Sequence, residues 1–201
     1  MSIAGIIPAR AGSKRVPGKN TKELDGKPLI MWTIEAAQKC FSLSQIIVSS
    51  DDDKVRTLIK GHARWHRRPK HLATDDALTI DVLHDILKVF HTNSFCLLQP
   101  TSPFRTPVDI DHCCDLHKWS NLPVISVSES DPDRPNGAVY VGTVEWLKHC
   151  RNEATYTYPF DLPGTVKHRM STLRSLDIDT EADFSHAEHL ASGMKDGWYK
   201  T

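Results

Sequence analysis

The stretch IAGIIPARAGSKRVPGKN, residues 3–20, joins a short apolar run to a basic loop that contains two glycines. Its apolar start, Ile3–Ile7, is interrupted only by Gly5 and predicts a short buried strand that ends at Pro8. The loop that follows, 9–20, carries two glycines, one serine, two lysines and two arginines. Backbone amides beside glycines can approach phosphate oxygens and the cations neutralise them, so this composition is typical of a polyphosphate site.

The spacing within this loop narrows the function. It matches neither the Walker A pattern nor the GxGxxG fingerprint, which removes the main support for a kinase, a GTPase or a dehydrogenase. The alternative is a solvated basic turn without a ligand.

Outward from this stretch, short apolar runs alternate with segments of helical periodicity. The predicted helices cover 29–40, 55–59, 80–90, 106–117, 144–150 and 180–191. The predicted strands cover 3–7, 46–49, 95–98, 123–127, 138–141 and 173–178. This alternation predicts an α/β fold, with a mostly parallel sheet and helices on both faces. We expect one domain over residues 1–192 and a flexible tail over 193–201.

The overall composition excludes several classes of protein. The 201 residues include 25 Lys plus Arg and 25 Asp plus Glu, so the formal net charge is zero and nothing draws the chain to nucleic acid or membranes. No apolar run approaches the roughly 20 residues of a membrane span, and the start MSIAGIIPAR does not resemble a signal peptide. Five irregularly spaced cysteines form no disulfide framework, so we expect a cytoplasmic protein.

Two carboxylates, Asp177 and Asp179, end the last predicted strand. Residues i and i+2 of a strand point to the same side, so both carboxylates should face one point. Paired carboxylates suit Mg²⁺ or Mn²⁺ that bridges phosphate oxygens. The alternative is a surface turn in which Asp179 or Thr180 caps the last helix.

Two further segments are weaker signals on their own. The loop LLQPTSPFR, 97–105, places the amide of Gln99 at a strand end, where it could bind a hydroxylated ligand. Asn136-Gly137 is typical of a tight turn. Because ligands bind at the carboxyl ends of parallel strands, we expect the first loop, the Gln99 loop and residues 177–179 to converge.

Taken together, five segments resemble the acylneuraminate (CMP-sialic acid, nonulosonic acid) cytidylyltransferase family. They are IPARAGSKRVPGKN, VSSDDD, LLQPTSPFR, RPNGAVY and LDIDTEADF, in family order and over most of the chain. The resemblance implies a single-domain nucleotidyltransferase (Rossmann-like) fold. It also implies that the anomeric hydroxyl of a sugar acid attacks the α-phosphate of CTP and releases pyrophosphate, without a covalent enzyme nucleophile.

The resemblance further implies roles for single residues. The nucleotide would be bound by Ala9, Arg10, Ser13, Lys14, Lys19, Asn20 and Arg68. The sugar would be bound by Gln99, Asp75, Arg134 and Asn136. Mg²⁺, or Mn²⁺ in its place, would be held by Asp177 and Asp179, and the catalytic residues would be Arg10, Lys14 and Asp179.

The resemblance leaves alternatives for the sugar substrate and for the oligomeric state. A related family that activates 3-deoxy-octulosonate carries an aspartate at the position of Gln99, so the resemblance favours a nine-carbon acid. An eight-carbon or modified acid sugar is the first alternative, and a CTP-binding relative without sugar turnover is the second. The family insert that carries dimer contacts and part of a carboxylate clamp is reduced here to SESDPD, 128–133, with Arg134 the nearest cation. A homodimer is therefore possible, but most of its family contact is missing.

Overall fold

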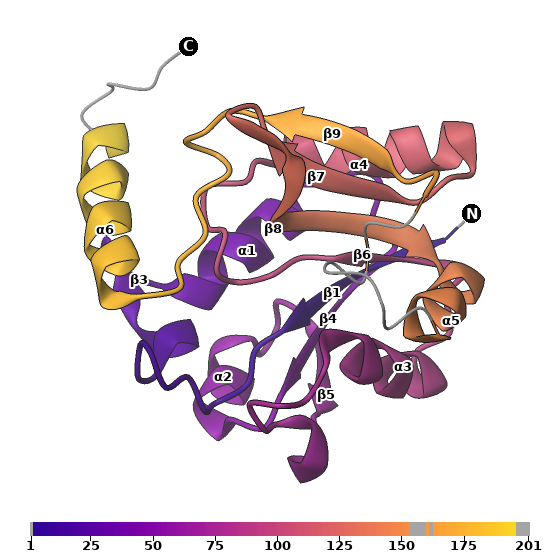
Figure 1. Cartoon of the computed structure of the whole chain (residues 1–201). Coiled ribbons are helices and arrows are strands. Elements are labelled where there is room, and N and C mark those ends of the chain that lie inside the picture. The colour runs from indigo at the N-terminus through magenta and orange to yellow at the C-terminus, as the bar shows by residue number, and fades with distance from the viewer. Residues whose placement is uncertain (1, 153–159, 161–162, 196–201) are drawn as a thin grey trace.

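The computed structural model describes residues 2–152, 160 and 163–195, built around a seven-stranded sheet (Figure 1). In spatial order the strands are β5 (Arg64–Arg67), β4 (Gln45–Ser50), β1 (Ile3–Pro8), β6 (Ser94–Leu97), β8 (Asp131–Thr143), β7 (Val124–Ser128) and β9 (Val166–Met170). Strand β8 runs antiparallel to β6 and β7, whereas the other four pairings are parallel. The predicted α/β fold with a mostly parallel sheet is confirmed.

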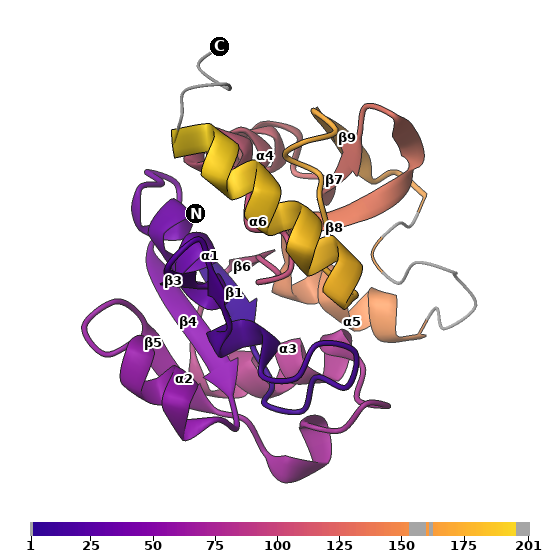
Figure 2. The ribbon, with the colours of Figure 1, turned by 90° about the vertical axis from the view of Figure 1, so that its left-hand side faces the viewer.

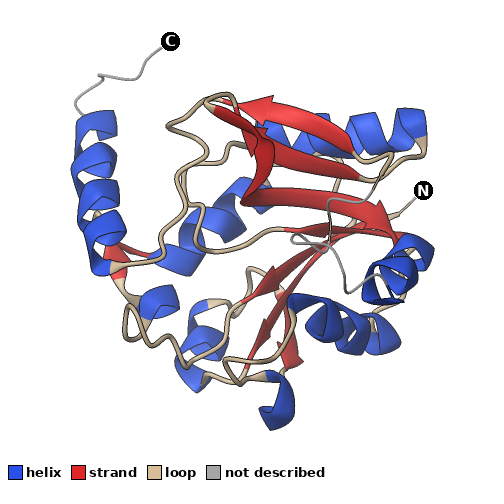
Figure 3. Ribbon diagram, in the orientation of Figure 1, coloured by secondary structure: helices blue, strands red, loops and turns tan. Residues whose placement is uncertain are grey.

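Helices cover both faces of this sheet (Figure 3). Ile3 and Ile7 of β1 pack toward α1 (Leu29–Gln38), α2 (Asp53–Leu58) and α4 (Pro107–Ser120). The alternate residues Ala4 and Ile6 pack toward α3 (Thr79–Val89) and α5 (Val144–Asn152). Successive side chains of a strand point to opposite faces, so one apolar run supplies both cores.

A third apolar cluster ties the carboxyl-end loops together. Phe184 of α6 (Glu181–Lys195) packs there with Ile178 and with Val16 from the first loop, all at most 1% exposed. Figure 2 shows α6, in yellow, lying across the molecule in front of the sheet. A small ribbon, β2 (Glu23–Leu24) and β3 (Lys27–Pro28), and the 3₁₀ turns η1 (Lys19–Thr21) and η2 (Lys70–Leu72) complete the described elements. The cluster fixes the first loop against the segment that carries the two carboxylates.

The strand predicted over 173–178 is wrong. Ser175 N–H donates to the carbonyl of Ser171 and Leu176 N–H to that of Leu173, which makes turns instead of a ladder. The apolar residues of this segment pack against α6, not into the sheet. The seventh strand is β9, which precedes it and pairs with β7.

Two smaller expectations also change. Helix α6 continues to Lys195, so residues 193–195 are helical and do not belong to a tail, while 196–201 lie outside the described residues. Asn136-Gly137 does not form a tight turn, because it lies inside β8 where the pairing with β7 shifts register. The short connection that the sequence predicts ahead of Arg134 is confirmed, since only Glu129 and Ser130 separate β7 from β8.

The predictions about membrane spans and about the cysteines can be compared with the described residues. No helix among them is both long and apolar enough to cross a bilayer. Cys40, Cys96, Cys113 and Cys114 are free thiols.

Candidate active site

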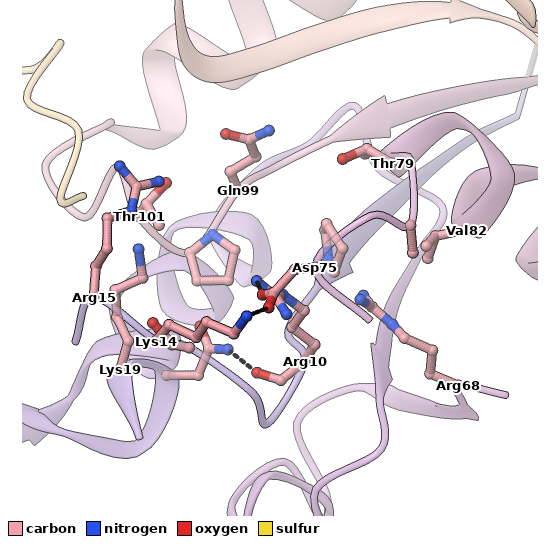
Figure 4. A pocket seen from close by; sticks show the side chains of 15 residues that line it. Arg10, Lys14, Arg15, Lys19, Arg68, Asp75, Thr79, Val82, Gln99 and Thr101 are labelled. Carbon is pink, nitrogen blue, oxygen red and sulfur yellow. Dashed lines mark hydrogen bonds and ion pairs between the residues drawn. The ribbon is translucent and has the colours of Figure 1, made fainter. Parts of the chain in front are cut away.

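A cavity of about 560 Å³ opens where the loops after β1 and β6 meet (Figure 4). Its lining includes eight of the residues singled out from the sequence: Arg10, Ser13, Lys14, Lys19, Asn20, Arg68, Asp75 and Gln99. Figure 4 shows Arg15, Lys19 and Thr101 at one end, Arg68 at the other, and Arg10 with Lys14 between them. The predicted convergence of the first loop and the Gln99 loop is therefore confirmed.

The first loop is held rigid by its own polar groups. Asn20 Nδ2 donates to the carbonyl of Arg10 at 2.9 Å, and the backbone N–H of Ala11 donates to Asp51 Oδ1 at 2.8 Å. Gly18 has a φ of +64°, a left-handed conformation that favours glycine, and leads into η1. These contacts leave the cationic side chains of the loop to line the cavity.

Ala9 takes a different place from the expected one. It is fully buried, and its N–H donates to the carbonyl of Ser49 at 2.8 Å. It does not line the cavity, so its part is to anchor the loop to β4.

Asp75 contacts two cations of the first loop, Arg10 and Lys14. The family resemblance instead implies a contact between Asp75 and the sugar. Asp75 Oδ1 is 2.6 Å from Arg10 Nη2, and Asp75 Oδ2 is 2.5 Å from Lys14 Nζ. Hydrogen bonds from Lys14 and Arg10 hold the pKa of the Asp75 carboxyl below its usual value. The carboxylate therefore occupies the position where these two cations would meet a phosphate.

A buried arginine fixes the backbone of Gln99. The guanidinium of Arg105 donates from Nη2 to the Gln99 carbonyl and from Nη1 to Thr33 Oγ1, the latter at 2.7 Å. Burial lowers the pKa of Arg105 to about 10, so it stays a cation at neutral pH. Its charge lies directly behind the Gln99 loop.

Three oxygens gather around Gly137. A Cβ at this position would lie 3.0 Å from Gln99 Oε1 and 3.7 Å from both Asp177 Oδ2 and Ser102 Oγ. Ser102 Oγ and the other Asp177 oxygen, Oδ1, are buried and have no hydrogen-bond partner among the described residues. Buried polar atoms are normally paired, so this corner is prepared for a polar ligand or a cation.

Replacing Gly137 with alanine tests this corner. Its φ of +80° makes any side chain strained by about 1–2 kcal/mol, and the new methyl would push on Gln99 Oε1. We expect a lower melting temperature and a lower affinity for any ligand that contacts Gln99, with the affinity for a ligand held by Arg10 and Lys14 unchanged.

Gly61→Ala is the matched control. Gly61 has a nearly equal φ of +84°, but nothing lies within 4 Å of its added Cβ. It should lower stability without any effect on ligand binding. Equal effects of both variants on binding would contradict the proximity argument.

The two carboxylates lie on an extended segment, not on a strand. Between them, Ile178 N–H donates to the carbonyl of Thr101 at 2.8 Å, and Lys19 Nζ donates to the carbonyl of Ile178 at 2.7 Å. Burial raises the pKa of Asp177. The segment is thus tied both to the Gln99 loop and to the first loop.

Asp179 faces the cations of the first loop. Its oxygens are each 3.2 Å from an Arg15 nitrogen, and Lys19 Nζ is 3.9 Å away. Burial lowers the pKa of Lys19, and both aspartates oppose this effect. Of the two capping residues in the alternative, Thr180 is confirmed, since it forms the cap of α6 with Asp183, whereas the Asp179 side chain does not take part.

These carboxylates fit a divalent cation. The described residues contain no group of three or more His, Cys, Asp or Glu side chains that could hold a metal. A cation bound by two carboxylates would take its other ligands from phosphate oxygens and water, as Mg²⁺ commonly does.

The structure does not bring the two β8 residues into the cavity. Asn136 accepts from Ser126 Oγ at 2.6 Å and donates to Ser175 Oγ at 2.9 Å, so its amide braces the register shift in β8. Arg134 is an exposed residue of the same strand and does not line the cavity. Neither residue lines this cavity, and their contacts with a sugar stay predictions.

Sequence reasoning missed seven lining residues, among them Arg15 and Thr101. Both lie inside segments that the sequence had already singled out, so the missing information was the direction of their side chains. The pairing of Arg15 with Asp179 joins residues more than 160 positions apart, which no local pattern indicates.

Comparison with known proteins identifies relatives of this chain. The chain is 34% identical to the CMP-N,N'-diacetyllegionaminic acid synthase of Legionella pneumophila, over 94% of this chain and 96% of that protein. It is 29% identical to the N-acylneuraminate cytidylyltransferase of Escherichia coli over 92% of this chain, and spans about half (51%) of that relative's length.

Solved structures share the fold. A CMP:2-keto-3-deoxy-manno-octonic acid synthetase complexed with CTP superposes with a TM-score of 0.77 at 16% identity, covering 96% of this chain and all of that one. A cytidylyltransferase from Leptospira borgpetersenii gives a TM-score of 0.76 at 18% identity, covering 96% and 87%. The family model described as cytidylyltransferase matches residues 4–199. Since that match spans nearly the whole chain, this protein belongs to the cytidylyltransferase family.

Proposed function

We propose that the protein transfers CMP from CTP to the anomeric hydroxyl of a nonulosonic acid and releases pyrophosphate. The observation that carries this proposal is a single cavity in which Arg10, Lys14 and Lys19 lie next to Gln99. The near full-length similarity to a CMP-N,N'-diacetyllegionaminic acid synthase supports the sugar class. Because CTP is an intracellular metabolite, we place the reaction in the cytoplasm.

The cations of the first loop bind the nucleotide. Displacement at the α-phosphorus needs neutralisation of the phosphate charge and of the departing pyrophosphate, more than any covalent chemistry from the protein. Arg10 and Lys14 supply that charge in the middle of the cavity, and Ser13 lines it beside them. Lys19, between the two aspartates, links the phosphates to the carboxylate segment.

Asp177 and Asp179 are the residues that would hold Mg²⁺, or Mn²⁺ in its place. When bound, such a cation neutralises phosphate oxygens and lowers the pKa of a hydroxyl that contacts it. The unpaired, buried Oδ1 of Asp177 supports this assignment. Arg15 and Lys19 hold the Asp179 carboxylate in place beside the phosphate cations.

Gln99 is placed to contact the sugar. Its backbone is fixed by Arg105, and its side chain oxygen lies in the corner formed with Asp177 and Ser102. An amide can donate and accept at once, which suits hydroxyl and acyl-amide groups. We therefore favour a nine-carbon acid over an eight-carbon acid.

Pyrophosphate release tests the function. The purified protein is assayed with CTP and Mg²⁺ against N,N'-diacetyllegionaminic acid, N-acetylneuraminic acid and 3-deoxy-manno-octulosonic acid, with UTP, ATP and metal-free controls. We expect release with CTP, Mg²⁺ and a nine-carbon acid. Release only with the eight-carbon acid would contradict the substrate class, and CTP binding without release from any sugar would contradict the transfer.

Asp75→Asn should tighten CTP binding. Removing this carboxylate frees Arg10 and Lys14 for the triphosphate, and the size of an exposed ion pair suggests a KM for CTP about twofold to fivefold lower. The KM for the sugar should not change. Asp76→Asn is the matched control, because this exposed neighbouring carboxylate makes no ion pair among the described residues. A higher sugar KM in Asp75→Asn would instead support the sugar contact inferred from the sequence.

A further inference from the structure

We propose that a side-chain relay of Asp85, His66 and Ser49 positions Arg68 for the nucleotide. The three are positioning residues, since Arg68 is the only one of the four that lines the cavity. The proposal rests on the function above in one respect, namely that CTP occupies this cavity.

Two nitrogens of the Arg68 guanidinium donate to Ser49, and the third makes no hydrogen bond to the described residues. The residue follows β5 and is 6% exposed. Its Nε donates to Ser49 Oγ at 3.3 Å, and its Nη2 donates to the Ser49 carbonyl at 3.1 Å. Nη1 makes no hydrogen bond to the described residues, so it can donate to a ligand. In Figure 4 the Arg68 side chain lies at the end of the cavity away from Arg15 and Lys19.

Arg68 remains a cation in this position. Burial lowers its pKa to about 10, while nearby Asp51 acts in the opposite direction. A charged, planar donor fixed at two nitrogens is suited to phosphate or carbonyl oxygens. The position of the Arg68 guanidinium in the cavity therefore depends on the position of the Ser49 hydroxyl.

The relay holds that hydroxyl in one orientation. His66 Nδ1 lies 3.0 Å from Ser49 Oγ, and His66 Nε2 lies 3.4 Å from Asp85 Oδ2. With Asp85 ionised, its charge 3.4 Å from Nε2 favours the imidazole tautomer that carries its proton on Nε2, which leaves Nδ1 as an acceptor. Ser49 must then donate its hydroxyl proton to Nδ1, and its oxygen is left to accept from Arg68 Nε.

In this arrangement the Ser49 hydroxyl donates to His66 Nδ1 and accepts from Arg68 Nε. Burial lowers the pKa of His66, against the opposite effect of Asp85, so the ring is neutral at pH 7 as the arrangement requires. Buried networks of this kind are rigid when all members are satisfied. The relay thus connects α3, which carries Asp85, through β5 and β4 to the cavity.

Ser49, His66 and Asp85 have the composition of a nucleophilic triad but not its function. Ser49 is fully buried, so no substrate atom reaches its hydroxyl. The proton of that hydroxyl is used to orient Arg68, and phosphoryl transfer to a sugar hydroxyl needs no enzyme nucleophile.

CTP binding, measured by titration calorimetry without sugar, tests the relay. His66→Phe keeps an aromatic ring and removes the hydrogen bond to Ser49 and the contact with Asp85. We expect the Kd for CTP to rise about threefold to tenfold, the value of one ordinary hydrogen bond. Asp85→Ala should act in the same direction, and Asp85→Asn should retain much of the wild-type affinity because its Oδ1 can still accept from Nε2. Asp85 is 25% exposed in its side chain, so these variants are expected to fold.

His117→Phe is the matched control. His117 is also buried and bonded to a serine hydroxyl, with its Nε2 3.1 Å from Ser94 Oγ and its Nδ1 2.6 Å from the Leu122 carbonyl. Ser94 begins β6, at the end of the strand opposite the cavity. This variant should lower the melting temperature and leave CTP affinity unchanged.

The decisive comparison repeats His66→Phe in an Arg68→Ala background. If the relay acts through Arg68, the effect on the Kd disappears there. An equal loss of affinity in both backgrounds, or a loss no larger than that of His117→Phe, would overturn the relay while leaving the proposed function intact. A wild-type protein that binds no CTP would overturn both.

Discussion

Asp179→Ala is expected to lower kcat about 10²–10³-fold, the size of effect seen when a group that stabilises charge in a transition state is removed. Asp179 is one of two carboxylates that would hold the divalent cation, and it lies beside Lys19 and Arg15 of the first loop. Its side chain is 48% exposed and does not cap α6, so the fold should remain. Turnover at saturating CTP, sugar and Mg²⁺, with a melting curve, measures both effects.

Glu181→Ala is the control for this substitution. Glu181 is two residues away and pairs with Lys22 at 2.5 Å, so its removal also deletes an exposed ion pair. Exposed ion pairs contribute about 0–1 kcal/mol to stability, so both variants should melt near the wild type. If Asp179→Ala retained near-normal turnover, the assignment of the metal site would be wrong.

Arg10→Met is expected to raise the KM for CTP about tenfold to a hundredfold, since a hydrogen bond to a charged group is worth more than a neutral one. Arg10 lies in the middle of the cavity and contacts the same carboxylate as Lys14. Loss of the guanidinium also leaves Asp75 less neutralised where the phosphates bind. The KM for the sugar should stay the same, because the Gln99 corner is formed by other residues.

Lys39→Met controls for the loss of one positive charge. Lys39 is an exposed residue at the end of α1 and does not line the cavity. Initial rates over a range of CTP concentrations should match the wild type for this variant. The same rise in KM in both variants would mean that net charge, not the position of Arg10, controls nucleotide binding.

The strongly periodic elements could be predicted from the sequence because their apolar residues report burial directly. Ile3–Ile7 and the helix over 80–90 are examples, since each places large apolar side chains at regular spacing against a core. The edge strands β5 and β9 could not, because RWHR and VKHRM carry mostly polar residues. A strand at the edge of a sheet needs fewer apolar side chains, so its pattern is weak.

In the segment 173–178, by contrast, the sequence predicts a strand where the structure has none. Its leucines and Ile178 are apolar because they pack against α6, and a short apolar run does not reveal which element it packs against. The two carboxylates do not line the cavity, but hydrogen bonds join Ile178 between them to Lys19 and Thr101, which do.

The sequence predicts which segments of the chain form the candidate site. The first loop and the Gln99 loop meet as expected, since the carboxyl ends of parallel strands share one edge. Pairings between distant side chains were not predictable, such as Asp75 with Arg10 or the relay that ends at Arg68. They depend on loop conformations that no periodicity encodes.

The measurement that tests the central claim most directly is ³¹P NMR of one reaction containing the protein, CTP, Mg²⁺ and N,N'-diacetyllegionaminic acid. Attack of the anomeric hydroxyl on the α-phosphorus predicts one new phosphodiester signal and an equal amount of pyrophosphate, both dependent on sugar and enzyme. Loss of CTP to CMP or CDP without a phosphodiester signal, when the same sample binds both ligands, would contradict the transfer of CMP to the sugar.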